Sequence, residues 1–495
     1  MFLLRGVPQS VQTDGWWLSS APPSPPRPPI GAKDGPKSTD SWALRAGALV
    51  GLLALADGLI WQVVPGVSLA VFGLAVLGIG WICAGFRGGK GVILAALLFL
   101  PVLERAQALS LGFWVLGLVL GAGWIALARF PGLSGALRFL LHAPETVSEG
   151  LSAMYRRGAG SWRGGLHAGV LGWLLPLGLG ALFLVLLSNA NPLLYRWLSG
   201  ALWVDGPGIA PDRVMFWALM ALLLWPFVSL GRMRQRLDLG FAPPRARRVP
   251  RVFNEGSVRR SLVMFNVVFA VQSLTDLAIL SGGATLPAGM SYAEYAHRGA
   301  YPLLVTALLA GAFALVARPF TTQSRVLRLA LLGWLGQTFF LVISSLFRLE
   351  SYVFAYGLTH LRLAALVWMG LVAVGVLLVM WQVLRHHGAL WMLKRCGLLG
   401  IGTLYLCSFL SFADVIARFN LSHDVPVDAR YLCQLDRAAV PAIRDFELRS
   451  GRTLCGGGPL EWSADWREWG FRDWRTARSL AALETAGAVR AWPTF

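Results

Sequence analysis

Charged residues are scarce in this 495-residue chain, at 14% against roughly 25% in an ordinary soluble domain. A water-facing surface needs charge, so this shortage and the mean hydropathy of +0.59 exclude an ordinary soluble fold. The charge that is present is unbalanced, with 44 Lys and Arg against 25 Asp and Glu, a net charge of +19. The basic residues form short clusters between apolar runs, which argues against nucleic-acid binding and for loops on the cytoplasmic side of a membrane.

Several recognisable motifs are also missing. The N-terminus has no basic start followed by an uninterrupted apolar core and a small-residue cleavage site, so it is not a secretory signal. Residues 1–41 contain APPSPPRPP at 21–29, and we expect them to form a flexible cytoplasmic tail. No Walker loop, GxSxG, HExxH or cysteine pair at zinc spacing occurs. The sequence therefore implies no cofactor and favours a protein that is not an enzyme.

Long apolar runs dominate the rest of the chain. Runs of about 20 residues can cross a bilayer as helices. They are continuous in Leu, Val, Ala and Gly rather than alternating, which favours helices over the strands of a barrel. The sequence predicts an all-α polytopic transmembrane bundle of about eleven spans. We place these spans at 42–64, 66–86, 90–106, 109–128, 167–188, 213–231, 260–281, 298–317, 325–347, 361–383 and 396–416.

Lys and Arg concentrate in every second connection between these runs. The strongest cluster has nine arginines between Arg232 and Arg260. By the positive-inside rule these connections are cytoplasmic, so the N-terminus lies inside and an odd number of spans places the C-terminal region outside. We expect the inner membrane of a bacterium. The predicted regions are the tail 1–41, N-terminal helices 42–231, a basic cytoplasmic loop 232–259, C-terminal helices 260–416 and an extracytoplasmic appendage 417–495.

The C-terminal segment differs in kind, because from Arg418 onward it holds 11 Arg and 10 Asp or Glu and no spanning run. We expect a small, mainly helical appendage. Cys433 and Cys455 are the only cysteines placed outside, where the compartment is oxidising. A bridge between them would close a loop of about 23 residues and stabilise the appendage by roughly 3 kcal/mol. The sequence favours that disulfide over two free thiols, and it requires Cα atoms within about 7 Å of each other.

Four stretches resemble a bacterial membrane family, that of the domain of unknown function 4153/4173. The most specific signal is SYAEYAHRG at 291–299 followed by YGLTHLRL at 356–363, although His360 stands where a basic residue is expected. The resemblance covers roughly residues 260–480 and implies a membrane protein of unassigned activity, with no catalytic residues to carry over. The four stretches are 274–309, 351–368, 412–421 and 427–443.

Polar residues gather near the predicted outer ends of the last five spans. They suggest either one outward-facing polar cleft or interhelical ion pairs that fix the bundle, and we favour the ion pairs. Glu294, His297 and His360 could supply three metal ligands, but a hydrogen-bonded histidine is the simpler interpretation and we predict no metal. The candidate binding residues are Gln272, Asp276, Glu294, His297, Arg298, Arg348, His360, Arg362, Asp414 and Arg418.

Three functional classes follow from this organisation. The leading one is a scaffold, sensor or envelope component that contacts the lipid bilayer and unknown protein partners, with the appendage as its contact surface. The alternative is a small-solute transporter, which needs polar groups that continue inward from the outer cleft. Asp57 is the best candidate for an acid in the middle of the membrane. A membrane enzyme is third, since it would need a closed constellation of groups at one depth.

Overall fold

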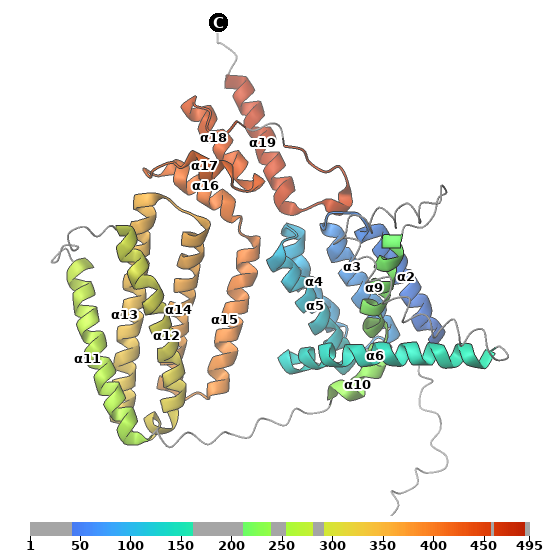
Figure 1. Cartoon of the computed structure of the whole chain (residues 1–495), viewed down its shortest axis with the longest axis horizontal. Helices are drawn as coiled ribbons and strands as arrows, with labels where there is room; N and C mark the ends of the chain where they lie inside the picture. The colour runs from blue at the N-terminus through green and yellow to red at the C-terminus, as the bar shows by residue number, and fades with distance from the viewer. Residues whose placement is uncertain (1–41, 162–210, 239–253, 281–291, 457–459, 491–495) are drawn as a thin grey trace, which may run out of the picture.

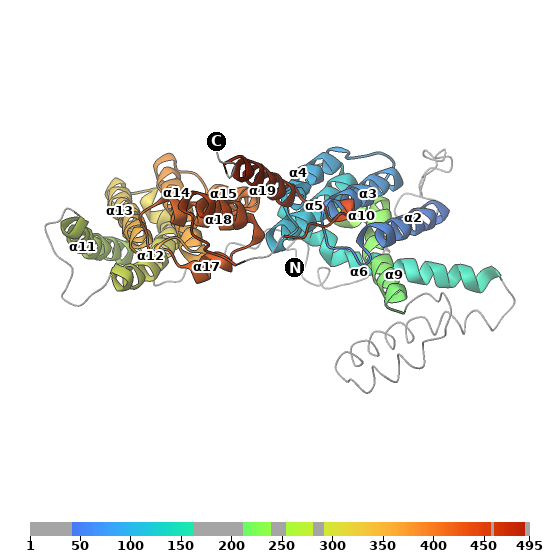
Figure 2. The same cartoon turned by 90° about the horizontal axis from the view of Figure 1, so that it is seen from above.

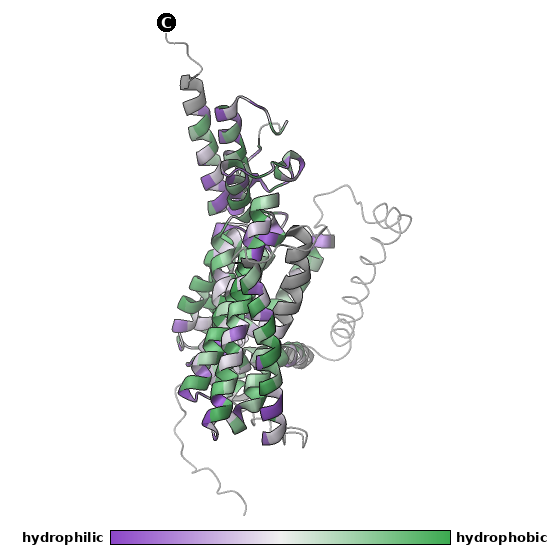
Figure 3. Ribbon diagram, turned by 90° about the vertical axis from the view of Figure 1, so that its left-hand side faces the viewer, coloured by the Kyte–Doolittle hydropathy of each residue, from purple (hydrophilic) through white to green (hydrophobic). Residues whose placement is uncertain are grey.

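The computed structural model describes five stretches of the chain: 42–161, 211–238, 254–280, 292–456 and 460–490. Every regular element in them is helical. Figure 1 shows two helical bundles side by side and a group of shorter helices across one end of both. Hydrophobic residues run along the bundles, and hydrophilic ones concentrate at the helix ends and in the terminal group (Figure 3). This distribution is that of a membrane protein.

The N-terminal bundle has one large apolar core. Leu52, Leu77, Phe99 and Ile125 are fully buried in it. Small residues let its helices approach closely, because a Cβ at Gly91 would lie 2.6 Å from the backbone oxygen of the facing helix. The bundle consists of α2 (Trp42–Ile60), α3 (Val67–Cys83), α4 (Lys90–Glu104), α5 (Ala108–Leu127), α9 (Pro211–Val228) and α10 (Leu230–Asp238), crossed by α6 (Gly132–Ser161).

The C-terminal bundle is a more open group with two smaller cores. In one core, Trp334 packs against Phe265 and Phe313, with ring centroids 4.7 and 5.6 Å away. Helix α15 runs between the bundles (Figures 1 and 2), and its Tyr405 hydroxyl donates to the carbonyl of Leu97 on α4 at 2.6 Å. The bundle consists of α11 (Glu255–Leu280), α12 (Tyr292–Thr321), α13 (Arg325–Tyr356), α14 (His360–Arg385) and α15 (Ala389–Phe409).

The shorter helices at one end form a unit that we call the cap, residues 412–490 without 457–459. Leu432, Ala439 and Ile443 form the centre of its own small core. A disulfide joins Cys433 to Cys455, with Cα atoms 5.6 Å apart. The cap contains α16 (Phe412–Ser422), α17 (Ala429–Cys433), the 3-10 turn η2 (Arg437–Ala439), α18 (Val440–Ser450), the 3-10 turn η3 (Trp466–Glu468) and α19 (Phe471–Arg490).

A buried carboxylate fixes the segment that carries the second cysteine of the cap. Glu447 accepts backbone N–H groups from Leu454 and Cys455 at 2.8 and 2.9 Å, and Arg444 lies 3.1 Å from its other oxygen. Burial by itself raises the pKa of Glu447, but the two N–H groups and the Arg444 guanidinium outweigh it and lower the pKa. The ionised carboxylate therefore holds this segment against α18.

The boundaries of several predicted spans change. The helix of the eleventh predicted span ends early. Leu410 is extended and terminates α15, and the cap helix α16 starts at Phe412. Helix α13 continues past the predicted end at 347 to Tyr356. Residues 132–161, expected to be a connection, form the long helix α6.

In the described ranges, six helices are long and apolar enough to cross a membrane: α2, α5, α11, α13, α14 and α15. Helix α3 is apolar but shorter, and the predicted span 167–188 lies outside the described residues. The number eleven therefore stays a prediction. The described parts of the basic connections that follow α3, α5, α9, α12 and α14 lie at the end opposite the cap (Figure 1).

Candidate functional site

A buried ionic cluster lies between α11 and α13, near the end that carries the cap. Asp276 is 1% exposed and forms a salt bridge with Arg348, which is 8% exposed. The carboxylate also accepts from the amide of Gln272 and the hydroxyl of Ser344, each at 2.9 Å. Gln272 and Asp276 share a face of α11, and Ser344 and Arg348 share a face of α13, because both pairs are four residues apart. A carboxylate removed from water is stabilised here by a cation and two neutral donors.

A second group lies at the turn from α13 to α14. The guanidinium of Arg362 stacks on the Tyr352 ring at 4.1 Å and donates to its hydroxyl at 3.0 Å. It also donates to the carbonyls of Tyr356 and Gly357. These are the carbonyls of the last residue of α13 and of its C-cap, so the cation lies at the negative end of that helix. Gly357 has φ +77°, a conformation that favours glycine at such a turn.

The remaining described candidates contact the cap. His360 meets Tyr431 of α17, whose hydroxyl accepts from the His360 backbone N–H at 2.9 Å and lies 3.0 Å from its Nδ1. Asp414 and Arg418 pair at 2.9 Å on the exposed side of α16. Of the predicted binding residues, the structure thus brings together Gln272, Asp276 and Arg348, while Arg362, His360 and the Asp414–Arg418 pair make their described contacts elsewhere.

The motif residues Glu294, His297 and Arg298 lie in α12, so their backbone is helical as the pairing of Glu294 with Arg298 requires. Their side chains lie outside what the structure describes, and their membership of a common cleft stays a prediction. Among the described residues, no group of three His, Cys, Asp or Glu side chains could hold a metal ion.

Sequence reasoning missed the contact that joins the cap to the N-terminal bundle. Glu104, at the end of α4, is 5% exposed and accepts from Arg472 at 3.1 Å and Arg475 at 3.0 Å, both on α19. Arg472 also donates to the carbonyl of Ser408 on α15 at 2.9 Å. One arginine thus bonds to α4 and α15 at once. Glu104 interrupts an apolar run, which signals a polar partner, but nothing in the sequence points 368 residues ahead.

The position of Asp57 corrects another expectation. It lies in the last turn of α2, next to Gly58, whose carbonyl accepts from Arg467 of the cap, and therefore at the cap end of the helix rather than at its middle. Arg213 of α9 forms a bidentate ion pair with it, and the indole N–H of Trp217 donates at 2.9 Å. This geometry fixes α9 against α2, so Asp57 is bound as a structural acid.

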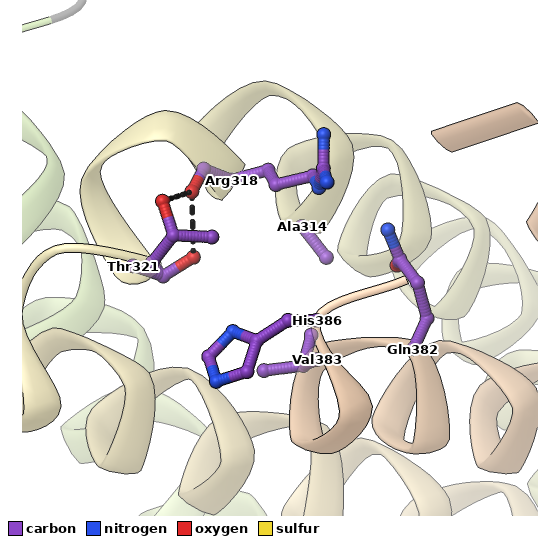
Figure 4. A pocket seen from close by; sticks show the side chains of 7 residues that line it. Ala314, Arg318, Thr321, Gln382, Val383 and His386 are labelled. Carbon is purple, nitrogen blue, oxygen red and sulfur yellow. Dashed lines mark hydrogen bonds between the residues drawn. The ribbon is translucent and has the colours of Figure 1, made fainter. Parts of the chain in front are cut away.

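The described residues also line a small pocket and a larger groove. At the end opposite the cap, a pocket between α12 and α14 is lined by Arg318, Thr321, Gln382 and His386 (Figure 4). Its volume of about 10 Å³ suits a single water. The other is a groove of about 580 Å³ between α16, α18 and α19 in the cap.

A family model described as "Domain of unknown function (DUF4153)" matches residues 46–446, most of both bundles and the first half of the cap. No curated protein and no solved structure matches the chain.

Proposed function

We propose that this chain, which belongs to the DUF4153 family of domains of unknown function, is a membrane scaffold of the bacterial envelope. Its cap would lie on the extracytoplasmic side of the inner membrane, hold the two bundles together and present its outer surface to envelope partners. The buried contact of Glu104 with Arg472 and Arg475 carries this proposal.

The cap bonds to both bundles by different means. Toward the N-terminal bundle, Arg467 donates to the carbonyl of Gly58 at 2.8 Å, and the N–H of Val67 donates to the carbonyl of Trp469 at 2.9 Å. Toward the C-terminal bundle, Asn420 forms two hydrogen bonds with the backbone of Leu358, at 2.6 and 2.9 Å. A unit fixed at both sides suits a connector.

The orientation rests on the basic connections, whose described parts lie opposite the cap, and on the oxidised cysteine pair. A reporter active only in the periplasm, fused after Phe495, should be active, and a cytoplasmic reporter at the same place should be silent. The reverse result would put the cap inside and contradict the proposed site of action.

The connecting role can be tested in the full chain with a protease site inserted at 239–253. After cleavage in detergent, the two fragments should remain together on a size-exclusion column. Glu104→Ala should release them, because it removes the acceptor of both arginines. Arg105→Ala is the matched control. Arg105 forms an ion pair with Asp436 in which both side chains are partly exposed, so its loss should change little. Fragments that separate without any substitution, or that stay together equally well in Glu104→Ala, would contradict the role.

One observation favours a transporter as the second candidate. Polar groups continue inward from Asp276 along α11 and α13: Gln337 donates to Asn266 at 3.4 Å, and Asn266 donates to the carbonyl of Ala330 at 2.9 Å. Acids and amides inside spans are often part of ion or proton pathways. In vesicles loaded with a pH-sensitive dye, the purified protein should then conduct protons, and Asp276→Asn should abolish the flux. Equal flux in protein-free vesicles would remove this candidate.

A further inference from the structure

The chain turns sharply where α5 ends. Ala128 has φ +56° and Gly132 has φ +62°, both in the left-handed region that redirects the backbone. Pro131 lies between them and packs near Gly123 and Gly135. As a result α6 does not turn back along α5 but runs across the N-terminal bundle, at the end opposite the cap (Figure 1). Thirty residues of helix extend about 45 Å.

One face of α6 is fixed to the bundle. Phe139 is 2% exposed and lies 5.3 Å from the ring of Phe227 on α9. Further along, the indole N–H of Trp225 donates to the carbonyl of Thr146 at 2.9 Å. Trp225 lies so close to Gly150 that a Cβ there would meet its ring at 2.2 Å. Positions 139, 146 and 150 share a side of the helix, so this side is occupied by protein.

A second face is apolar and has no described partner among the helices. Leu133, Leu137 and Leu140 are 84%, 48% and 53% exposed, and Leu151 is 51% exposed. Their spacing of four, three and eleven places them on one stripe. The third side carries polar residues, including Glu145, whose side chain is 58% exposed and pairs with His142. A helix in water would not gain from a continuous leucine stripe beside a polar one.

We infer that α6 is an in-plane membrane helix whose leucine stripe inserts into the lipid leaflet at the end opposite the cap. Two observations select lipid as the occupant. Helix α6 runs across the ends of the spanning helices (Figure 1), and therefore along the membrane surface rather than through it. In addition, the leucine side and the polar side of α6 lie next to each other between residues 133 and 151, which is the arrangement of interfacial helices.

The function of such a helix follows from its contacts. It is held to α9 by Trp225 and Phe227 and to α10 through Arg138, which donates to the carbonyl of Leu237. Lipid bound to the stripe would therefore set the depth of α9 and α10 relative to the leaflet. The site takes acyl chains of phospholipid near the headgroup boundary.

The test uses the full chain with Cys83, Cys396 and Cys407 replaced by Ala, so that the disulfide is kept. Leu140→Cys, labelled with an environment-sensitive fluorophore, is placed in vesicles of phosphatidylethanolamine and phosphatidylglycerol. Glu145→Cys is the matched control on the polar side. We expect nitroxide-labelled lipid to quench the label at 140 at least threefold more than at 145, and aqueous iodide to show the opposite order.

Leu133→Cys provides a second probe that removes little packing, since that side chain is 84% exposed. It should behave like position 140, which keeps the test valid if Leu140→Cys does not fold. Iodide quenching at 133 and 140 equal to that at 145 would overturn the proposal. Protection of both positions from iodide and from the lipid quencher would also overturn it, because a second copy or another protein segment would then cover the stripe.

Discussion

The two bundles bury their helices to different extents. In the N-terminal bundle, 22% of the spanning window of α2 and 50% of that of α5 are buried inside the protein; in the C-terminal bundle the buried share runs from 6% for α15 and 11% for α11 to 39% for α13. The N-terminal bundle packs glycines and aromatic rings closely, and the ion pairs of Asp57 and Glu104 lie at its cap end. The C-terminal bundle instead joins the largely exposed helix α11 to α13 through the ion pair of Asp276 with Arg348. Where lipid replaces protein neighbours, polar contacts must supply the specificity that packing supplies elsewhere.

The largest effect should come from the ionic cluster of the C-terminal bundle. Arg348→Leu leaves the buried Asp276 with only neutral donors, which costs about 3–5 kcal/mol. We expect a clear fall in the melting temperature of the purified protein, followed by tryptophan fluorescence. The double variant Asp276→Asn, Arg348→Leu should recover part of the loss because no buried charge remains. A single variant as stable as the wild type would show that α11 and α13 do not depend on this pair.

Loss of the disulfide should destabilise the cap and leave both bundles unchanged. Replacing Cys433 and Cys455 by Ser opens a loop of 22 residues, and the chain-entropy model gives a loss of roughly 3 kcal/mol. We expect faster proteolysis of residues 412–490 and unchanged protection of both bundles. Equal loss of protection in a bundle would mean that the cap does not melt as a unit of its own.

Two Gly→Ala substitutions compare the close helix packing of the N-terminal bundle with the looser packing of the C-terminal bundle. At Gly91 the new methyl group would lie 2.6 Å from the carbonyl oxygen of Gly121, so two helices must move apart. We expect a loss of about 1–3 kcal/mol. At Gly375 of α14 nothing lies within 4 Å, and alanine should be neutral or stabilise by up to about 1 kcal/mol. Thermal melts of both variants in one detergent measure the difference, and equal shifts would contradict it.

The smallest expected effect is the pH response of the cap. The pKa of Glu447 is lowered in the folded protein, so its contribution to stability is present above the unfolded value of about 4.3. It is lost as the pH falls through the folded pKa. Proteolysis of the cap should therefore accelerate in acid, and Glu447→Gln should flatten that dependence while Asp445→Asn, on an exposed pair, should not. Identical pH profiles in all three proteins would refute this role.

The helical membrane architecture and the family could be predicted from the sequence, because apolar runs are local signals and the motif around 291–299 is specific. The family match over 46–446 confirms the resemblance. The pairing of Gln272 with Asp276 was visible for the same reason, since residues four apart share a helix face. The five-residue segment 128–132, by contrast, decides the direction of α6, and hydropathy does not encode left-handed backbone conformations.

Contacts between segments far apart in the chain could not be predicted from the sequence. Glu104 with Arg472, Asp57 with Arg213 and Asn420 with Leu358 each join helices whose order in space no periodicity specifies. A charged residue in an apolar run indicates that it has a polar partner but does not identify that partner. The end of α15 at Phe409 and the start of α16 at Phe412 were not predicted, because the apolar pattern continues across the residues where the helix is interrupted.

The contact between Glu104 and Arg472 cannot form until late in synthesis of the chain. The two residues are 368 positions apart, and a ribosome that adds 5–20 residues per second needs roughly 20–70 s to make the second after the first. During that interval the first helices are already in the membrane, with a carboxylate whose final cations do not yet exist. Glu104 must stay hydrated at the membrane surface until α19 arrives, so the N-terminal bundle reaches its final form only after nearly all of the chain has been made.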